Sequence, residues 1–301
     1  MTSQTLVKKL GLTDVKKFND FLYLTKPTIT LLVVITSFPS IVIGSGGFPD
    51  GFILLATFLG TALVSSSAAV FNQVFEEDLD LNMLRTQSRS LPSGRLTAKE
   101  AFWFGLILGG LGLGTLYFAT TPLAAAIALC GHLFYIFIYT LWLKKRTPQN
   151  IVIGGMAGAV GPLIGWAAVS GDLAWPAWVL FFIITLWTPP HFWALALKYK
   201  EDYKKAGIPM YPVVHGDHKT RRAMMLYSLA LIPFVLSLYA FGKAGLLYAL
   251  VGSTFAIKFA WDSIRIFRSR TNDQVMPFFH FSCAYTFAIF GALALDSLIF
   301  N

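Results

Sequence analysis

Charge, cysteine and the common cofactor-binding motifs are all scarce in this sequence. Lys, Arg, Asp and Glu make up 13% of the 301 residues, whereas a soluble domain carries roughly a quarter. The two cysteines, Cys130 and Cys283, lie in apolar stretches, so no disulfide framework is indicated. The sequence contains no Walker A loop, no GxGxxG strand–helix unit and no CxxCH. It therefore does not indicate the nucleotide-binding or c-type heme proteins that those motifs define.

Long apolar runs dominate instead. Hydrophobic residues make up 55% of the chain, and they recur in runs of about twenty, the length of a helix that crosses a bilayer. A large soluble core of buried helices is the alternative, which so many runs disfavour. We predict an all-α, polytopic membrane protein, a bundle of about nine transmembrane helices. The predicted spans are residues 27–45, 52–71, 101–119, 122–142, 151–169, 175–197, 223–242, 245–264 and 278–298.

The net charge of +9 is distributed unevenly along the chain. Almost every Lys and Arg lies in the N-terminal segment or in alternate loops, at residues 72–100, 143–150, 198–222 and 265–277. By the positive-inside rule these loops and the N-terminus are cytoplasmic, and an odd number of spans places the C-terminus on the opposite side. Membrane topology thus explains the charge, and we expect no nucleic-acid partner.

Residues 1–26 form a basic segment before the first span. Its apolar residues follow the spacing of a short interfacial helix, at Leu12, Val15, Phe18 and Leu22. No signal-peptide cleavage pattern is present, and the segment is too acidic for a typical transit peptide. We expect a multi-pass protein of a bacterial cell (inner) membrane. Residues 27–301 would form one intramembrane domain, with spans 1–4 and 5–8 as two similar halves and span 9 added.

The charged residues concentrate in the stretch NQVFEEDLDLNMLRTQSRSLPSGR that follows the second span. On a helix, Asn72, Glu76 and Asp80 share one stripe because they are spaced by four. Their oxygen atoms suit Mg²⁺, which takes one or two carboxylates together with waters and substrate phosphates. Arg85 and Arg89 are also four apart and are placed to bind phosphate. A solvated loop that merely caps the span is the alternative.

A second constellation lies in the sixth span. Here Pro189-Pro190 is expected to kink or restart the helix. Beyond it, His191, Lys198 and Asp202 fall on one stripe at i, i+7 and i+11. A histidine inside an apolar span is a candidate functional residue. The alternatives are a packing histidine and a simple surface pair of Lys198 with Asp202.

Other positions leave two readings open. Lys144, in the basic loop LKKRTPQN, is either a topology signal or a phosphate contact. His132 and His280 are either packing residues or ligands of a metal or tetrapyrrole. Gly154, Gly155 and Gly158, with Pro162, permit either close helix packing or a wide pocket.

Acids and cations at one end of an apolar bundle suit an amphipathic, phosphorylated lipid. Mg²⁺ and cationic side chains would stabilise the charge that builds on a departing diphosphate. Apolar walls would hold the lipid chain and keep water from a carbocation. The residues therefore predict prenyl or polyprenyl transfer, or a related reaction of a lipid phosphate.

These motifs also resemble a known family. The pattern N-x3-[DE]-x3-D after the second span resembles the first aspartate-rich motif of the UbiA-type intramembrane prenyltransferases. The run from Asn72 to Arg89 resembles the heme-farnesylating branch in particular, as do Lys26-Pro27, TPQNIVIGGMAGAVGPLIGW, TPPHFWALALKYKEDY and AGIPMYPVVHG. The resemblance covers about residues 20 to 290.

The resemblance implies a nine-helix bundle with a central cavity open to the cytoplasmic side. Farnesyl diphosphate would bind there through Mg²⁺, and its farnesyl group would be joined to a vinyl group of protoheme IX. Water addition would then give heme O. The implied partners are these two substrates and the lipid bilayer, and the resemblance leaves room for proteins of heme biosynthesis or oxidase assembly.

Residue roles follow from the matching motif positions. The implied catalytic residues are Asn72, Glu76, Asp80, Lys198 and Asp202, of which the first three would hold the metal. The implied diphosphate contacts are Arg85, Arg89, Lys144 and Lys198. The implied heme-facing residues are His191 and Trp193.

Three positions depart from the wider family. Glu76 stands where many relatives have Asp, and Lys198 stands where quinone-type relatives have an acid, which favours the heme branch and leaves fewer metal ligands. Thr28 stands where a basic residue is common after Lys26-Pro27. An aromatic, quinone-type prenyltransferase and a non-enzymatic transporter of heme or lipid are the alternative functions, and a transporter gives no reason for the acid–arginine cluster.

Overall fold

The structure is a computed structural model, and it describes residues 12–84, 86–269 and 271–300. Within those residues the chain forms helices and no strand. In chain order the helices are α2 (Leu12–Leu24), α3 (Pro27–Ser45), α4 (Gly51–Phe75), α5 (Glu77–Leu81), α6 (Ala98–Ala119), α7 (Pro122–Leu133), the π-helix η1 (Phe134–Leu143), α8 (Asn150–Gly158), α9 (Gly161–Ser170), α10 (Trp175–Lys198), α11 (Lys200–Lys205), α12 (Tyr211–Ala240), α13 (Leu246–Ser269) and α14 (Val275–Phe300).

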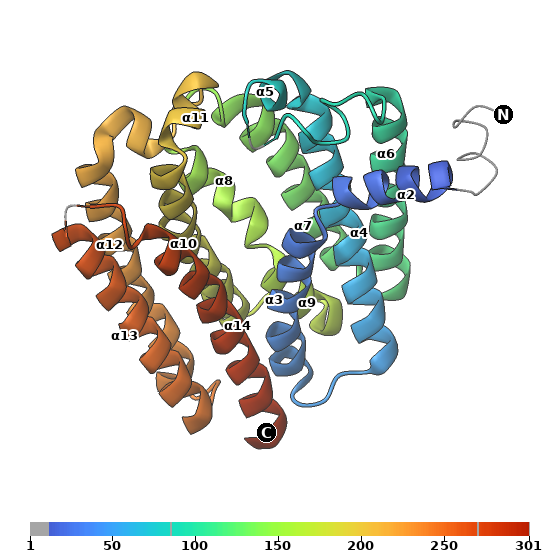
Figure 1. The fold of residues 1–301 in the computed structure, drawn as a ribbon. Helices are drawn as coiled ribbons and strands as arrows, with labels where there is room; N and C mark the ends of the chain where they lie inside the picture. The colour runs from blue at the N-terminus through green and yellow to red at the C-terminus, as the bar shows by residue number, and fades with distance from the viewer. Residues whose placement is uncertain (1–11, 85, 270, 301) are drawn as a thin grey trace.

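Eight helical stretches in the described part of the chain are long and apolar enough to cross a membrane. They are α3, α4, α6, α7 with η1, α8 with α9, α10, α12 and α14. The predicted eighth span, 245–264, corresponds to α13, which is of similar length but carries charges such as Lys258 and Asp262. It packs between α12 and α14 in the same bundle (Figure 1). The prediction of an all-α, multi-pass membrane protein is confirmed.

Glycines let the helices around the site approach closely. On α6, a Cβ atom at Gly112 would lie 2.8 Å from the carbonyl oxygen of Gly60 on α4. On α9, a Cβ atom at Gly161 would lie 2.6 Å from the carbonyl oxygen of Val33 on α3. Small residues at such crossings allow backbone-to-backbone packing without a hydrophobic driving force. They fix α4, which carries the acidic stripe, against its neighbours.

Helix continuity differs from the sequence expectation at two places. The sixth span does not restart at Pro189-Pro190, because α10 runs through both prolines as one helix packed against α12 and α14. Neighbouring helices make proline tolerable inside a membrane helix. The break lies in the fifth span instead, where α8 ends at Gly158 and α9 begins at Gly161 with Pro162 in its first turn. The expected loop 198–222 is largely helical as well, with Gly216 (φ 80°) joining two helical pieces in α12.

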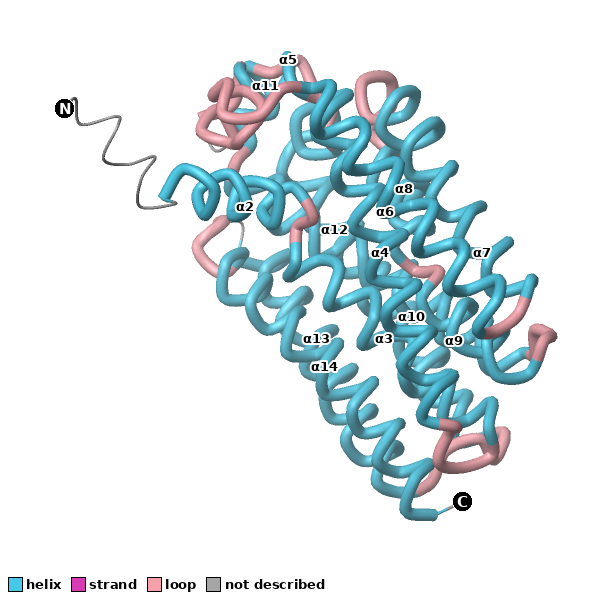
Figure 2. Tube along the Cα trace, turned by 90° about the vertical axis from the view of Figure 1, so that its right-hand side faces the viewer, coloured by secondary structure: helices cyan, strands magenta, loops and turns pink. Residues whose placement is uncertain are grey.

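The two long connections meet at one end of the bundle. Figures 1 and 2 show α5 and α11 at that end, with α2 lying across the long helices near it. The last turn of α14 lies at the opposite end. The helix expected in the N-terminal segment is present, and its location at a membrane surface stays a prediction. Lys8, Lys9, Arg85 and Asn301 lie outside the described residues.

Candidate active site

A cavity of about 640 Å³ lies at the end of the bundle formed by α5 and α11. One wall is ionic and comes from α4, α5 and the segments that pack on them. The other wall is largely apolar and comes from α8, α10 and the residues around α11, including Ile151, Phe192, Leu195, Ile208 and Met210. The cavity thus places charged groups opposite a hydrocarbon-like surface.

The acidic stripe is present and buried. α4 ends at Phe75, and Glu76 joins it to α5. The amide of Glu76 donates to the carbonyl of Asn72 (3.1 Å), and the amide of Asp80 donates to the carbonyl of Glu76 (2.8 Å), so the four-residue spacing survives the joint. Asn72, Glu76 and Asp80 line the cavity and are only 2%, 3% and 4% exposed. The structure therefore brings together the three side chains that the spacing predicted.

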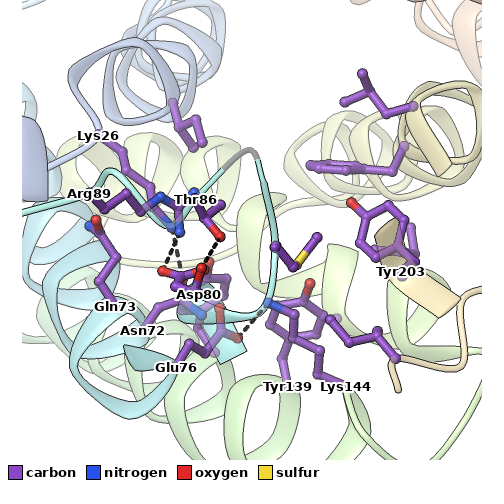
Figure 3. A pocket seen from close by; sticks show the side chains of 18 of the residues that line it. Lys26, Asn72, Gln73, Glu76, Asp80, Thr86, Arg89, Tyr139, Lys144 and Tyr203 are labelled. Carbon is purple, nitrogen blue, oxygen red and sulfur yellow. Dashed lines mark hydrogen bonds and ion pairs between the residues drawn. The ribbon is translucent and has the colours of Figure 1, made fainter. Parts of the chain in front are cut away.

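Each of these side chains contacts a cation from a different segment (Figure 3). The pairs are Lys26 Nζ to Asn72 Oδ1 at 2.7 Å, Lys144 Nζ to Glu76 Oε1 at 2.6 Å, and Arg89 Nη1 to Asp80 Oδ2 at 2.7 Å. Three positive and two negative side chains leave this described cluster with a net charge of +1. An anion with several oxygen atoms is the complementary ligand for such a cluster.

Lys26 is the functional residue that sequence reasoning missed. It precedes Pro27, the first residue of α3, and adopts a left-handed backbone conformation (φ 47°). Burial lowers its pKa to about 8, since the loss of solvent outweighs the nearby carboxylates of Glu76 and Asp80. The sequence marks it only as part of Lys26-Pro27, where proline begins the span.

Hydrogen bonds hold the loop that carries Arg89 at both of its ends. Near its start, the Thr86 hydroxyl donates to the Asp80 carbonyl at 2.9 Å. Farther along, the carboxylate of Asp20 on α2 accepts from the Ser90 hydroxyl (2.6 Å) and from Arg95 Nε (2.9 Å). Burial raises the pKa of Asp20, but these two hydrogen bonds outweigh it, so the pKa lies below its ordinary value. The loop and α2 are therefore held together beside the cavity.

Two glycines shape the apolar wall. A Cβ atom at Gly154 would overlap the ring of Tyr139 on η1, and one at Gly155 would lie 2.7 Å from Thr188 Cγ2 on α10. All four residues line the cavity. Close helix packing and a pocket are therefore both present at these glycines. The close packing brings Tyr139 and Thr188 to the cavity surface. Tyr203 lies across the cavity from Asp80 (Figure 3).

Other expected site residues do not line the cavity. Lys198 is exposed at the end of α10, and Asp202 on α11 is half-buried; both are absent from the cavity lining, although their neighbour Tyr203 is part of it. The expected diphosphate contact Arg85 lies outside the described residues. Of the expected diphosphate contacts, the structure brings Arg89 and Lys144 to the acidic stripe.

The expected heme-facing residues are not part of the cavity lining. His191 stacks between Trp187 (4.3 Å) and Phe279 (4.5 Å), and its Nδ1 lies 2.6 Å from Ser282 Oγ on α14. Trp193 is buried against Tyr211 and Tyr227 of α12. Neither residue lines the cavity, because α10 presents a different face to it, formed by Thr188, Phe192 and Leu195, and their heme-facing role stays a prediction.

The two other histidines expected in membrane spans, His132 and His280, occupy other environments. His132 Nε2 lies 3.0 Å from Ser67 Oγ on α4, at the wall of a smaller chamber below the main cavity. His280 is exposed on α14. Neither lies in the main cavity.

The donor set fits Mg²⁺. The described residues contain no cluster of three or more His, Cys, Asp and Glu side chains that could hold a metal. Two carboxylates and one amide oxygen are nevertheless a set that Mg²⁺ accepts when waters and substrate phosphates complete its octahedral shell. Each ion pair engages one carboxylate oxygen, Oε1 of Glu76 or Oδ2 of Asp80. The cavity beside them leaves room for the other ligands.

Fold and site together define a helical membrane protein with an ionic cluster facing an apolar cavity. Residues 33–287 match the model of the UbiA prenyltransferase family, which is most of the chain. The chain belongs to the UbiA family and is a prenyltransferase. The family resemblance seen in the motifs is therefore confirmed.

Similar curated proteins carry one more specific name. The chain is 45% identical over 282 residues to the protoheme IX farnesyltransferase of Gloeobacter violaceus, covering 93% of this chain and 92% of that protein. It is 43% identical over 279 residues to the protoheme IX farnesyltransferase of Symbiobacterium thermophilum, covering 92% and 93%.

Solved structures share the fold at low identity. A structure of digeranylgeranylglyceryl phosphate synthase is similar with a TM-score of 0.78 and 22% identity, covering 94% of this chain and 99% of that one. A UbiA homologue from Archaeoglobus fulgidus, bound to DMAPP and Mg²⁺, is similar with a TM-score of 0.67 and 18% identity, covering 94% and 100%.

Proposed function

We propose that this protein transfers the farnesyl group of farnesyl diphosphate to a vinyl group of protoheme IX. With the addition of water, the products are heme O and diphosphate. The observation that carries the proposal is the cavity itself, in which a cation-rich ionic wall faces an apolar wall beside membrane-embedded helices. The names of relatives that match nearly the whole chain select the two substrates.

The diphosphate binds at the ionic wall. Lys26, Arg89 and Lys144 converge there from three segments, so their charges reach phosphate oxygens from different directions. Arg85, Lys198 and Asp202 stay predicted contacts; Lys198 ends α10, and Asp202 lies on α11 directly before the cavity residue Tyr203.

The metal site uses the acidic stripe. Asn72, Glu76 and Asp80 would hold Mg²⁺ through an amide oxygen and two carboxylates. When bound, Mg²⁺ supplies positive charge that stabilises the departing diphosphate. The burial of these side chains strengthens their electrostatic interactions, because little water competes inside the cavity.

The apolar wall governs the carbon chemistry. The C–O bond of farnesyl diphosphate breaks with its electron pair leaving on diphosphate, and the farnesyl C1 forms a bond to the terminal carbon of the vinyl group. Water then adds to the other vinyl carbon and releases a proton. Phe192, Leu195 and Met210 hold the substrates together and limit premature capture of the allylic cation by water.

Location and orientation follow from the charge distribution. We place the protein in a bacterial cell (inner) membrane, with the cavity end and α2 on the cytoplasmic side and the end of α14 on the opposite side. The alternate basic loops support this orientation through the positive-inside rule. Proteins of heme biosynthesis or oxidase assembly are the proposed partners.

The function is tested with purified protein, protoheme, farnesyl diphosphate and Mg²⁺, followed by mass spectrometry of the porphyrin. We expect a product heavier than protoheme by one farnesyl group and one hydroxyl group, and no product when Mg²⁺ is chelated. Prenylation of 4-hydroxybenzoate without farnesylated heme would assign the protein to the quinone-type branch. Heme flux across vesicles without any diphosphate would indicate a transporter.

A further inference from the structure

A second, narrower chamber runs from the main cavity into the bundle. Its volume is about 90 Å³, against about 640 Å³ for the main cavity. Lys26, Ile29 and Tyr135 line both, so the chamber opens beside the ionic wall. It is too narrow for a porphyrin and suits a single aliphatic chain.

One wall of the chamber continues the acidic stripe along α4. Thr61, Ser65 and Ala68 line the chamber, and they lie eleven, seven and four positions before Asn72. At 100° per residue, all three are within roughly 40° of Asn72 around the helix axis. A ligand anchored by its diphosphate at Asn72 therefore has its hydrocarbon tail directed along small side chains of the same helix face.

The chamber has a definite depth. Thr61 is the α4 lining residue farthest from Asn72, and eleven residues of helix span about 16 Å. That is comparable with an extended chain of three isoprene units. Val64, Ala128 and Ile164, which also line the chamber, belong to one packed apolar cluster.

The break in the fifth span forms part of the wall. Ala157, in the last turn of α8, and Val160, within the interruption between α8 and α9, both line the chamber. Interrupted helix at membrane depth is tolerated where it is buried in protein or borders a cavity. The interruption is therefore accounted for by a chamber that extends between α3, α4, α7 and α9.

We infer that this chamber binds the distal isoprene units of the prenyl diphosphate, and that Thr61, Ser65 and Ala68 set the chain length that the enzyme accepts. The inference rests on the proposed function, which supplies the prenyl diphosphate. Along the helix axis, Ala68 lies about 6 Å and Ser65 about 10 Å from Asn72. Larger side chains at these positions should therefore shorten the accepted chain stepwise.

The test compares Ser65→Leu and Ala68→Leu with the wild-type protein, using geranyl and farnesyl diphosphate. Calorimetric affinities in the presence of Mg²⁺ and the mass of the prenylated porphyrin are the two readouts. For Ser65→Leu we expect the preference for farnesyl over geranyl diphosphate to fall at least about tenfold, since pocket fit of even one methylene gives 10–200-fold discrimination. For Ala68→Leu we expect both affinities to fall at least about tenfold.

Ala62→Leu is the matched control, because Ala62 neighbours Thr61 on α4 but lines neither the chamber nor the main cavity. It should leave the preference within twofold of wild type. Ser65→Met replaces Ser65→Leu in the same measurements if the leucine variant does not fold. An unchanged preference in a folded Ser65 variant, or an equal change in Ala62→Leu, overturns the inference. The wild-type protein could bind farnesyl diphosphate in preference to geranyl diphosphate and yet prenylate no porphyrin. That result would contradict the proposed acceptor and support the proposed role of the chamber in chain-length selection.

Discussion

Asp80 is the side chain on which most of the ionic site converges. Its carboxylate pairs with Arg89 at 2.7 Å, and its backbone carbonyl accepts the Thr86 hydroxyl at 2.9 Å. Its amide donates to Glu76 at the joint between α4 and α5. The backbone contacts hold the loop, whereas the carboxylate alone carries the charge proposed to bind metal.

Asp80→Asn should therefore lower kcat by at least about 100-fold, the scale expected when one charge-stabilising group is lost. The amide keeps the shape of the side chain and the backbone bonds, so the protein should stay folded in membranes. Asp78→Asn, on the exposed side of α5, is the control and should keep near wild-type turnover. Full activity of Asp80→Asn would refute the metal assignment.

Gly154→Ala tests the packing of the apolar wall. The new methyl group would overlap the Tyr139 ring, so we expect a loss of stability of about 1–3 kcal/mol, as for overpacked sites. Gly158→Ala is the matched control on the same helix, because a Cβ atom there meets nothing within 4 Å. Thermal unfolding in detergent measures both. Equal melting temperatures for the two variants would show that Tyr139 moves aside freely.

At single-residue resolution, the sequence predicted the acidic stripe but not its surroundings. Asn72, Glu76 and Asp80 follow from spacing along one helix, which is a local property. Lys26 reaches the stripe from another helix, and its position depends on how α3 packs against α4. For the same reason the sequence showed His191 to be intramembrane without showing which neighbour it faces.

At the scale of elements, α2 and the loop after α5 act as one unit. The carboxylate of Asp20 on α2 contacts both Ser90 and Arg95 of the loop, and Ser90 and Arg95 also line the cavity. A displacement of α2 should therefore also shift Ser90 and Arg95 at the cavity. The negative charge on Asp20 strengthens the hydrogen bonds that join α2 to the loop after α5.

This joint should weaken in acid. The folded-state pKa of Asp20 is lowered, so its stabilisation is present above the unfolded pKa of about 3.9 and is lost as the pH falls through the lower folded value. Asp20→Asn should lower the melting temperature at pH 7, and the difference from wild type should shrink toward pH 3. Asp78→Asn should show no such convergence. A difference that is constant with pH would contradict the prediction.

Helix continuity was the element-level property that sequence predicted least well. Pro189-Pro190 looks like a break, yet α10 is supported by neighbouring helices along this stretch. The break at residues 159–160 has Pro162 as its only strong local signal and coincides with a chamber. Whether a proline interrupts a membrane helix depends on the neighbouring helices that pack against it. Amino-acid composition does not specify those neighbours. The spans themselves were predictable because twenty apolar residues suffice to define one.

At the scale of the whole molecule, the basic loops and the ionic wall share one end of the bundle. The opposite loops contain Lys243 as their single basic residue. In intact cells, with Cys130 and Cys283 replaced, we expect Lys243→Cys to react with a membrane-impermeant maleimide and Lys145→Cys to react only after permeabilisation. The reverse pattern would invert the proposed orientation.

The pairing of both carboxylates of the acidic stripe with cations has a consequence for the order of binding. In the ligand-free protein the carboxylates of Glu76 and Asp80 already have counter-ions, Lys144 and Arg89. A divalent metal arriving alone must compete with them, whereas a diphosphate draws those cations to itself and exposes the carboxylates. On the proposed function, metal and prenyl diphosphate are therefore expected to enter as one complex through an exchange of counter-ions, and a site without its lipid substrate is expected to retain little free metal.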